Sequence, residues 1–132
     1  EIIGLQPITR LPRVTEYIRG VINLRGKVIP VMNLARRFGL GDREDTSLTC
    51  VIVTELPRDD GPITMGIIVD EVSEVINIKA ESIEAPPELG DATGSRFLSG
   101  MGKVEDKVVI LLDVEAVLGP GTAVAEQLQE AS

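Results

Sequence analysis

Arg25 is the residue whose setting most strongly indicates a binding role in this chain of 132 residues. It stands in the string Asn23-Leu24-Arg25-Gly26, between two aliphatic runs that favour β-strands, so it is expected at a turn. Packing does not require a cation there, and a guanidinium can grip a carboxylate through two parallel hydrogen bonds. Glu1 is the expected partner if the chain closes on itself. The alternative is a local salt bridge that only fixes the turn.

Residues that could perform catalysis or hold a metal are scarce. The chain has no histidine, and its one cysteine, Cys50, lies in an apolar run where an inert core thiol is expected. Histidine-based triads, Cys/His zinc sites, haem on histidine and internal disulfides are therefore excluded. The carboxylates show no spacing that indicates an acid–base pair, and residues 100–103 lack the spacing of a P-loop. We predict no enzyme activity, no cofactor and no metal site.

Charge is unevenly distributed along the chain, whose formal net charge is −8. Residues 1–43 hold eight Lys and Arg against three acidic residues, and residues 44–132 hold five against eighteen. Such asymmetry is typical of two different contact surfaces, or of two solvated faces that happen to differ. A β-barrel that binds nucleic acid is an alternative, but three aromatic residues and the negative net charge disfavour it.

The pattern is that of an all-β chain with short helices. Runs of β-branched and aliphatic residues predict strands at 21–24, 28–34, 48–56, 63–69, 72–78, 97–104 and 107–112. Helical turns are predicted at 35–40 and 113–118. Residues 120–132 have helical composition but a thin apolar face, so we expect a C-terminal tail. No stretch is long and apolar enough for a membrane span.

An internal repeat runs through this pattern at a constant offset of 80 residues. Gly20 aligns with Gly100 and Lys27 with Lys107, and each copy reads glycine, strand, lysine, apolar strand and helical turn. Two predicted strands precede the second copy and have no counterpart before the first. We therefore expect the first barrel to lack about two N-terminal strands in this chain. A strand-swapped homodimer or a frayed edge would then follow.

From the repeat we assign residues 1–47, with an uncertain share of 105–132, to the first barrel and residues 48–104 to the second.

The run Gly-Val-Ile-Asn-Leu-Arg-Gly-Lys-Val-Ile-Pro-Val resembles the CheW family of chemotaxis coupling proteins. Further similar segments are 7–12, 66–72 and 98–102. The resemblance implies one CheW-like domain over residues 1–119, made of two SH3-like five-stranded β-barrels with a groove between them. The same module occurs in the kinase CheA and in CheV, so both stay open as alternatives.

The resemblance also implies a function in two-component signal transduction. Family members are non-enzymatic adaptors that couple methyl-accepting chemoreceptors to the histidine kinase CheA. A cytoplasmic protein recruited to membrane-associated receptor arrays is expected, without direct membrane insertion and without nucleic acid. Candidates for kinase and receptor contact are Glu1, Ile2, Gly20, Asn23 and Arg25. Candidates for a groove that takes a receptor helix are Val28, Val31, Ile67 and Val69. Burial in a barrel core is the alternative for each of these four.

Overall fold

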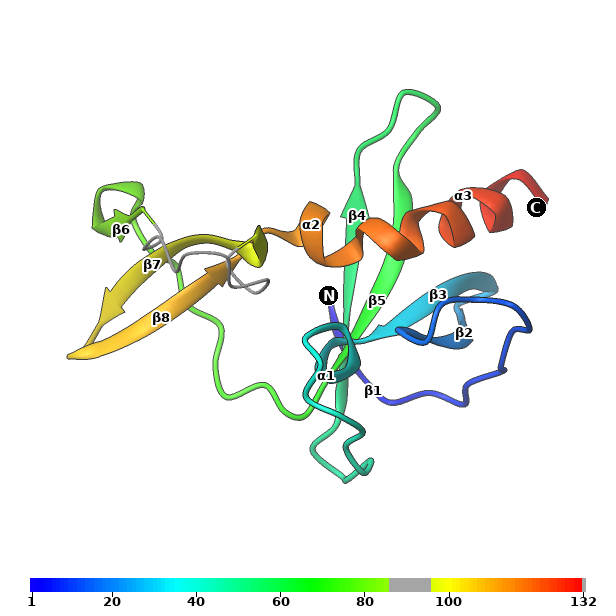
Figure 1. Ribbon diagram of the computed structural model, residues 1–132, viewed down its shortest axis with the longest axis horizontal. Coiled ribbons are helices and arrows are strands. Elements are labelled where there is room, and N and C mark those ends of the chain that lie inside the picture. The colour runs from blue at the N-terminus through cyan, green and yellow to red at the C-terminus, as the bar shows by residue number, and fades with distance from the viewer. Residues whose placement is uncertain (86–95, 132) are drawn as a thin grey trace. The chain divides into compact units, whose positions relative to one another are not determined.

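The structure is a computed structural model that describes residues 1–85 and 96–131. The chain forms two compact units. Unit 1 contains Glu1–Ser73 together with Leu118–Ser132, and unit 2 contains Glu74–Val117. Both consist mainly of strands with a few short helices (Figure 1). This confirms the prediction of an all-β chain with short helices, and the strands form two sheets.

Unit 1 contains a five-stranded sheet in the order β1-β4-β5-β3-β2. Its strands are β1 (Ile2–Gly4), β2 (Ile18–Leu24), β3 (Lys27–Asn33), β4 (Cys50–Leu56) and β5 (Ile63–Val69). The pairs β2–β3 and β4–β5 are antiparallel hairpins, and β3 runs parallel to β5. Helix α1 (Leu34–Arg37) follows β3 directly. The side chain of Asn33 caps this helix by accepting a hydrogen bond from the Arg36 amide.

The N-terminal segment closes this sheet into a barrel. β1 pairs with β4, and a few residues later Thr9 bridges to Val21 of β2 through two hydrogen bonds of 2.8 and 2.9 Å. The chains approach closely because Gly20 has no side chain, and a Cβ there would lie 2.2 Å from the Thr9 carbonyl oxygen. The same stretch of chain thus contains the strand at one end of the order, β1, and contacts the strand at the other end, β2. Closure of this kind removes the open edges that favour aggregation.

The interior of unit 1 is aliphatic. Five residues that are at most 5% exposed form one cluster, Ile22, Ile29, Val31, Val51 and Ile68. Partly buried residues pack against this cluster, namely Ile3, Leu5, Ile8, Leu24 and Val53. Full burial of an aliphatic side chain contributes about 1.5–3 kcal/mol, so this cluster makes a large contribution to the stability of the unit.

The C-terminal residues from Leu118 onward belong to unit 1. They follow helix α2 (Val114–Leu118), which lies in unit 2 except for its last residue, and they form the 3-10 turn η3 (Gly119–Gly121) and α3 (Thr122–Ala131). α3 contacts β3 and β5 (Figure 1). Gly121 is buried so closely against Met65 that a Cβ would lie 2.6 Å from its methyl group, and Ala125 is 4% exposed. The expected tail is therefore a packed helix, because small residues let it lie against the sheet without a wide apolar face.

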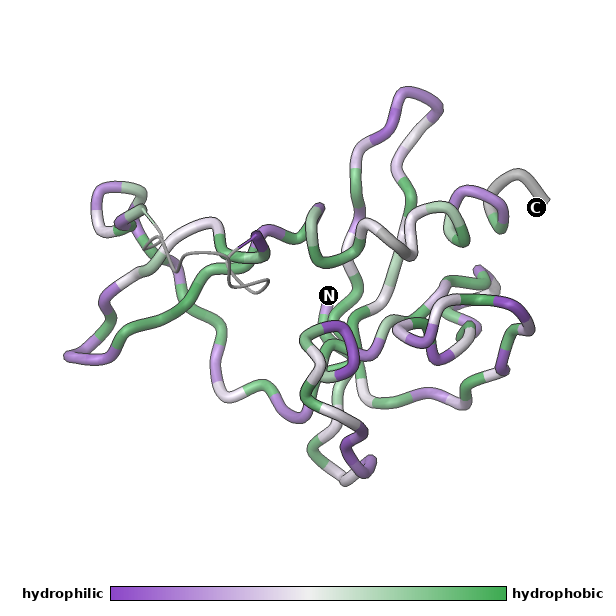
Figure 2. Tube along the Cα trace, in the orientation of Figure 1, coloured by the Kyte–Doolittle hydropathy of each residue, from purple (hydrophilic) through white to green (hydrophobic). Residues whose placement is uncertain are grey.

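Unit 2 contains a three-stranded antiparallel sheet in the order β6-β7-β8. Its elements are the 3-10 turn η1 (Ala80–Ser82), β6 (Ile83–Glu84), β7 (Leu98–Val104) and β8 (Lys107–Leu112). β8 is apolar along most of its length (Figure 2), yet none of its residues is fully buried. Among the described residues, β8 pairs with β7 alone.

The hairpins β2–β3 and β7–β8 repeat one another in detail. They share the same antiparallel register, with an irregularity between the first and third residues of the first strand. Both turn through two residues with positive φ, Arg25-Gly26 in one copy and Glu105-Asp106 in the other. At the end of each hairpin the side chain of Asn33 or Asp113 accepts a 3.2 Å hydrogen bond from an amide three residues later. The repeat at an offset of 80 is therefore confirmed at the level of individual hydrogen bonds.

The assignment of strands to the two units needs a correction. The sequence places residues 48–104 in the second barrel, whereas in the structure β4 and β5 lie between β1 and β3 in unit 1. Unit 1 thus has five strands within the chain, and the expected shortage falls on unit 2, where three strands are described. An apolar run defines a strand but not its partner, and pairing here buries Val51 and Ile68 in the unit 1 core.

Candidate functional site

The turn between β2 and β3 presents the side chain of Arg25 to solvent. Arg25 and Gly26 have φ angles of +51° and +86°, as in the two-residue turns that match the twist of a hairpin. Asn23 Oδ1 accepts a 2.8 Å hydrogen bond from the Gly26 amide, which stabilises the turn from within. Because these neighbours hold the backbone, the guanidinium of Arg25 is available for another interaction.

Arg25 binds Glu1 across the closure of the barrel. Its Nη1 and Nη2 donate to the two carboxylate oxygens of Glu1 at 2.8 and 2.6 Å, so the predicted pair is confirmed. The Val53 amide donates to the Glu1 carbonyl oxygen at 2.8 Å and holds the acidic residue beside β4. The hydrogen bond from Arg25 lowers the pKa of the Glu1 carboxyl, and the same bond raises the pKa of Arg25. Both groups are therefore charged at neutral pH.

Both partners of this pair stay open to solvent. The side chain of Arg25 is 68% exposed and that of Glu1 is 42% exposed. Water and salt screen such a pair, so it contributes little to folding stability. Ile2, beside Glu1 in β1, is 42% exposed and adds apolar surface. The pair thus offers two opposite charges in a fixed geometry, next to an apolar side chain.

Two of the five predicted contact residues have structural roles. Gly20, with a φ of +149°, allows the close approach of Thr9 described above. Asn23 stabilises the turn. Glu1, Ile2 and Arg25 are the three that remain available to a partner.

Two of the four groove candidates lie in the interior. Val31 is fully buried in the aliphatic cluster and Ile67 is 8% exposed, so the core alternative is correct for both. Val28 is 49% exposed, and Val69 is half-buried at the edge of a small pocket beside α1. The sequence could not separate them because β3 is buried on both faces from Ile29 onward, without the alternation of a half-exposed strand.

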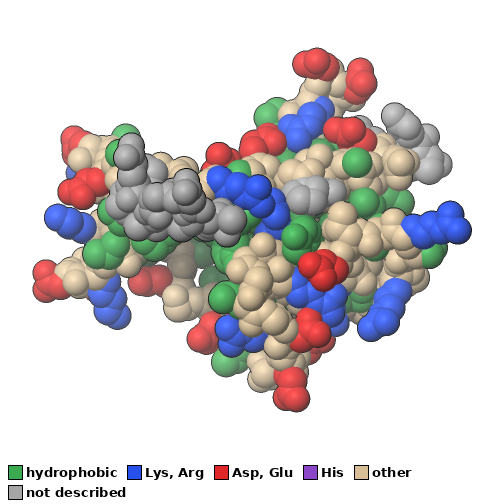
Figure 3. Space-filling view, viewed as in Figure 1, with side chains coloured by type: hydrophobic (Ala, Val, Ile, Leu, Met, Phe, Trp, Pro, Cys, Tyr) green, Lys and Arg blue, Asp and Glu red, His purple; other side chains and the backbone are tan. Residues whose placement is uncertain are grey.

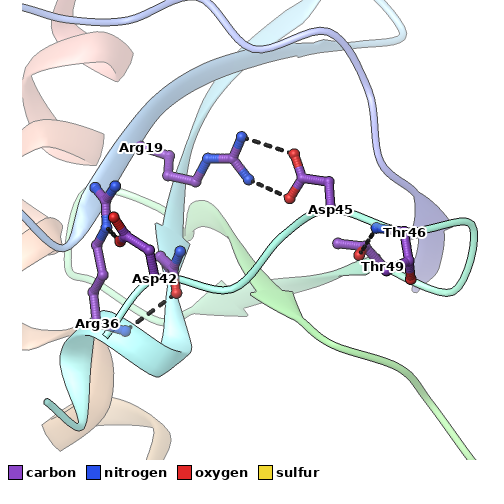
Figure 4. A network of polar contacts seen from close by, with 7 residues as sticks. Arg19, Arg36, Asp42, Asp45, Thr46 and Thr49 are labelled. Atoms are coloured by element: carbon purple, nitrogen blue, oxygen red, sulfur yellow. Dashed lines mark hydrogen bonds and ion pairs between the residues drawn. The ribbon is translucent and has the colours of Figure 1, made fainter. Parts of the chain in front are cut away.

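Sequence reasoning missed a network of arginines and aspartates near α1. Basic and acidic side chains lie next to one another on the surface shown in Figure 3, and Figure 4 shows this network closely. Arg19 of β2 donates to both carboxylate oxygens of Asp45 at 2.9 and 3.0 Å. Arg36 of α1 donates from Nε to Asp42 at 2.5 Å, and this bond lowers the pKa of the Asp42 carboxyl. Both aspartates lie in residues 40–46, which have no regular secondary structure, so only the fold brings them to the arginines.

Within residues 1–85 and 96–131, no group of three or more His, Cys, Asp and Glu side chains is placed to hold a metal ion. None of the helices described there is long and apolar enough to cross a membrane. Cys50 is half-buried rather than fully buried, and its Sγ lies 3.1 Å from the Leu48 carbonyl oxygen.

Comparison with known proteins shows the family of this chain. The family model described as the CheW-like domain matches residues 1–120. The chain belongs to the CheW-like family. Among its relatives, the chemotaxis protein CheW of Klebsiella aerogenes is 34% identical over 89% of this chain and 69% of its own length. The chemotaxis protein CheW of Bacillus subtilis is 39% identical over 86% of this chain and 70% of its own length.

The fold of the CheW-like domain is also found in a solved structure. The crystal structure of the scaffolding protein TtCheW from Thermoanaerobacter tengcongensis has a TM-score of 0.74 and is 37% identical, covering 89% of this chain and 73% of that chain. The CheW-like match runs through both units and ends at residue 120, just before α3. The predicted family and the all-β fold are thereby confirmed.

Proposed function

We propose that this CheW-like chain is a chemotaxis adaptor that couples methyl-accepting chemoreceptors to the histidine kinase CheA. Relatives named chemotaxis protein CheW and a structural neighbour named a scaffolding protein support this role. The observation that carries the proposal is the exposed Glu1–Arg25 pair. It lies beside the run of sequence on which the resemblance to the family is most specific.

The geometry suits the contact of an adaptor with the kinase. The backbone on both sides of the pair is held by hydrogen bonds, so a partner meets charges that are already in place. Preorganised charges favour correct orientation and rapid association. Ile2 and Val28, both exposed in unit 1, supply the apolar area that an interface core needs. We assign the kinase contact to this surface of unit 1.

Val28 and Val69 are the two groove candidates left for a receptor helix. The adaptor performs no catalysis and joins membrane-associated arrays through its partners rather than by insertion. A CheW-like module of a CheA or CheV protein is the alternative, and the complete open reading frame distinguishes it from a separate adaptor.

The test is a reconstituted assay of receptor-dependent CheA activity with Arg25→Ala. We expect the apparent affinity of the chain for the receptor–kinase complex to fall by about fivefold or more, as for a central interface residue. Arg25→Glu should be worse, because it adds repulsion against Glu1 and against any acidic group of the partner. Unchanged coupling in the Arg25→Ala variant would show that Arg25 is not part of the kinase contact.

Two controls separate a contact from a local salt bridge. Arg13 is exposed and has a φ of +58°, close to that of Arg25, so Arg13→Ala removes the same charge from the same backbone conformation. It should leave coupling intact. The exchange Glu1→Arg with Arg25→Glu restores an ion pair with reversed polarity. If coupling returns with the exchange, the pair only stabilises the turn, and the contact role is wrong.

A further inference from the structure

A hollow of about 320 Å³ opens on unit 1 beside the network of Figure 4. Neither Glu1 nor Arg25 lines it, nor does any other residue that the sequence proposed for partner contact or for the groove. Its lining combines aliphatic side chains with three guanidinium groups. The aliphatic residues are Ile8, Leu11, Val14 and Ile18, and the cationic residues are Arg10, Arg19 and Arg36.

Two of the three guanidinium groups are held in place by unit 1 itself. Arg36 donates from Nη1 to the Glu16 carbonyl oxygen at 3.1 Å and from Nε to Asp42, while Arg19 is paired with Asp45. The side chains of Arg36 and Arg19 are 33% and 26% exposed, so both are partly withdrawn from water. Arginines held in this way lose little conformational entropy when a ligand binds.

The third guanidinium, that of Arg10, is exposed and has no hydrogen bond or ion pair with the residues of ranges 1–85 and 96–131. Glu16 is the single acidic residue in the lining, against three arginines. The pairs with Asp42 and Asp45 show that the neighbouring guanidiniums bind carboxylates. The hollow therefore combines an aliphatic wall with one unpaired guanidinium, that of Arg10, while the other two guanidiniums are already paired with aspartates.

We propose that this hollow docks an acidic side chain of a protein partner, glutamate in preference to aspartate. The methylene groups of glutamate contact the aliphatic wall, and its carboxylate binds Arg10 at the rim. A nucleic acid fits less well, because its row of phosphates needs several cations, whereas Arg19 and Arg36 are already paired with aspartates and Arg10 alone is left. This docking site does not depend on the adaptor function proposed above.

The test uses the full chain with two synthetic peptides as probes, one of alternating leucine and glutamate and one with glutamine in place of glutamate. Binding is followed by NMR of the arginine side chains. We expect the glutamate peptide to shift the Nε–H resonances of Arg10 and Arg19 to saturation, and the glutamine peptide to leave them in place. Arg10→Ala should weaken binding about fivefold, whereas Arg13→Ala should change it less than about twofold.

A variant that binds the glutamate peptide more tightly distinguishes an effect on the docking site from partial unfolding of the protein. Asp45→Asn removes a carboxylate that competes for Arg19, so it should strengthen binding about twofold or more. A damaged protein cannot imitate this result. Equal binding of the two peptides, equal losses in Arg10→Ala and Arg13→Ala, or weaker binding by Asp45→Asn would each overturn the proposal. Tighter, Arg10-dependent binding of a single-stranded oligonucleotide, or Arg10-dependent self-association in sedimentation, would overturn it in favour of another occupant.

Discussion

Arg25 is a candidate for recognition because other residues perform the structural work of its turn. Gly26 and Asn23 stabilise the backbone, and Glu1 orients the guanidinium. Gly20 lies in the same run of sequence, but the close approach of Thr9 explains why a glycine stands there. Residues of one motif thus divide into those that shape the barrel and those that face solvent.

The Glu1–Arg25 pair predicts a pH dependence whose sign follows from the lowered pKa of the Glu1 carboxyl. Because the folded pKa lies below the ordinary value of about 4.3, the pair stabilises the fold fully above that value. Its contribution is lost as the pH falls through the folded pKa. A carbon NMR titration should show Glu1 titrating at low pH, and Arg25→Ala should return it to the ordinary range. Asp42 should titrate low in both proteins, because its partner is Arg36; an unchanged Glu1 curve would contradict the coupling.

We predict that the same substitution, valine to lysine, has opposite effects on stability at Val28 and at Val31. Val31→Lys places a charge in the aliphatic core and should destabilise unit 1 by more than about 3 kcal/mol, or prevent folding. Val28→Lys changes a side chain that is 49% exposed and should alter stability by less than about 0.5 kcal/mol. Denaturant unfolding of both variants measures the difference. A stable Val28→Lys variant can then be assayed for receptor binding, which tests the groove itself.

At the scale of elements, the two hairpins have the same local structure and different surroundings. β3 lies between β2 and β5, whereas β8 pairs with β7 alone among the described residues. Turns, caps and bulges depend on residues within each hairpin, which is why the repeat preserves them. The partner on the outer edge depends on another segment of the chain.

This difference predicts unequal protection of equivalent strands. The Asp113 amide donates to the Phe97 carbonyl oxygen and the Asn33 amide to that of Tyr17, so the preceding amides, Leu112 and Met32, face the outer edge of each hairpin. In hydrogen exchange of the intact protein, Leu112 of β8 should exchange about tenfold faster than Met32, its equivalent in β3. Amides that face the other strand of the same hairpin serve as an internal control, because they are hydrogen-bonded in both copies. Equal protection would show instead that β8 is paired on its outer edge in the native protein.

At the scale of the whole molecule, the fold mixes the charges that the sequence separates. Unit 1 has nine Lys and Arg against twelve acidic residues, and unit 2 has four against nine. Both units are therefore acidic, although residues 1–43 are basic. Arg19–Asp45 joins the basic segment to the acids that follow it, and Arg36–Asp42 lies within the basic segment itself. The two contact surfaces predicted from charge do not coincide with the two units.

The sequence by itself determined the features that depend on neighbouring residues. Its apolar runs, turn residues and offset repeat predicted the β2–β3 and β7–β8 hairpins, and the turn at Arg25 led to the pair with Glu1. The tertiary structure decided which unit receives β4 and β5, whether Val31 is core or surface, and where α3 packs. It also gathered Arg10, Arg19 and Arg36 around one hollow. These outcomes depend on contacts between distant segments, and a local pattern of polarity does not specify which of several apolar partners a strand or helix will meet.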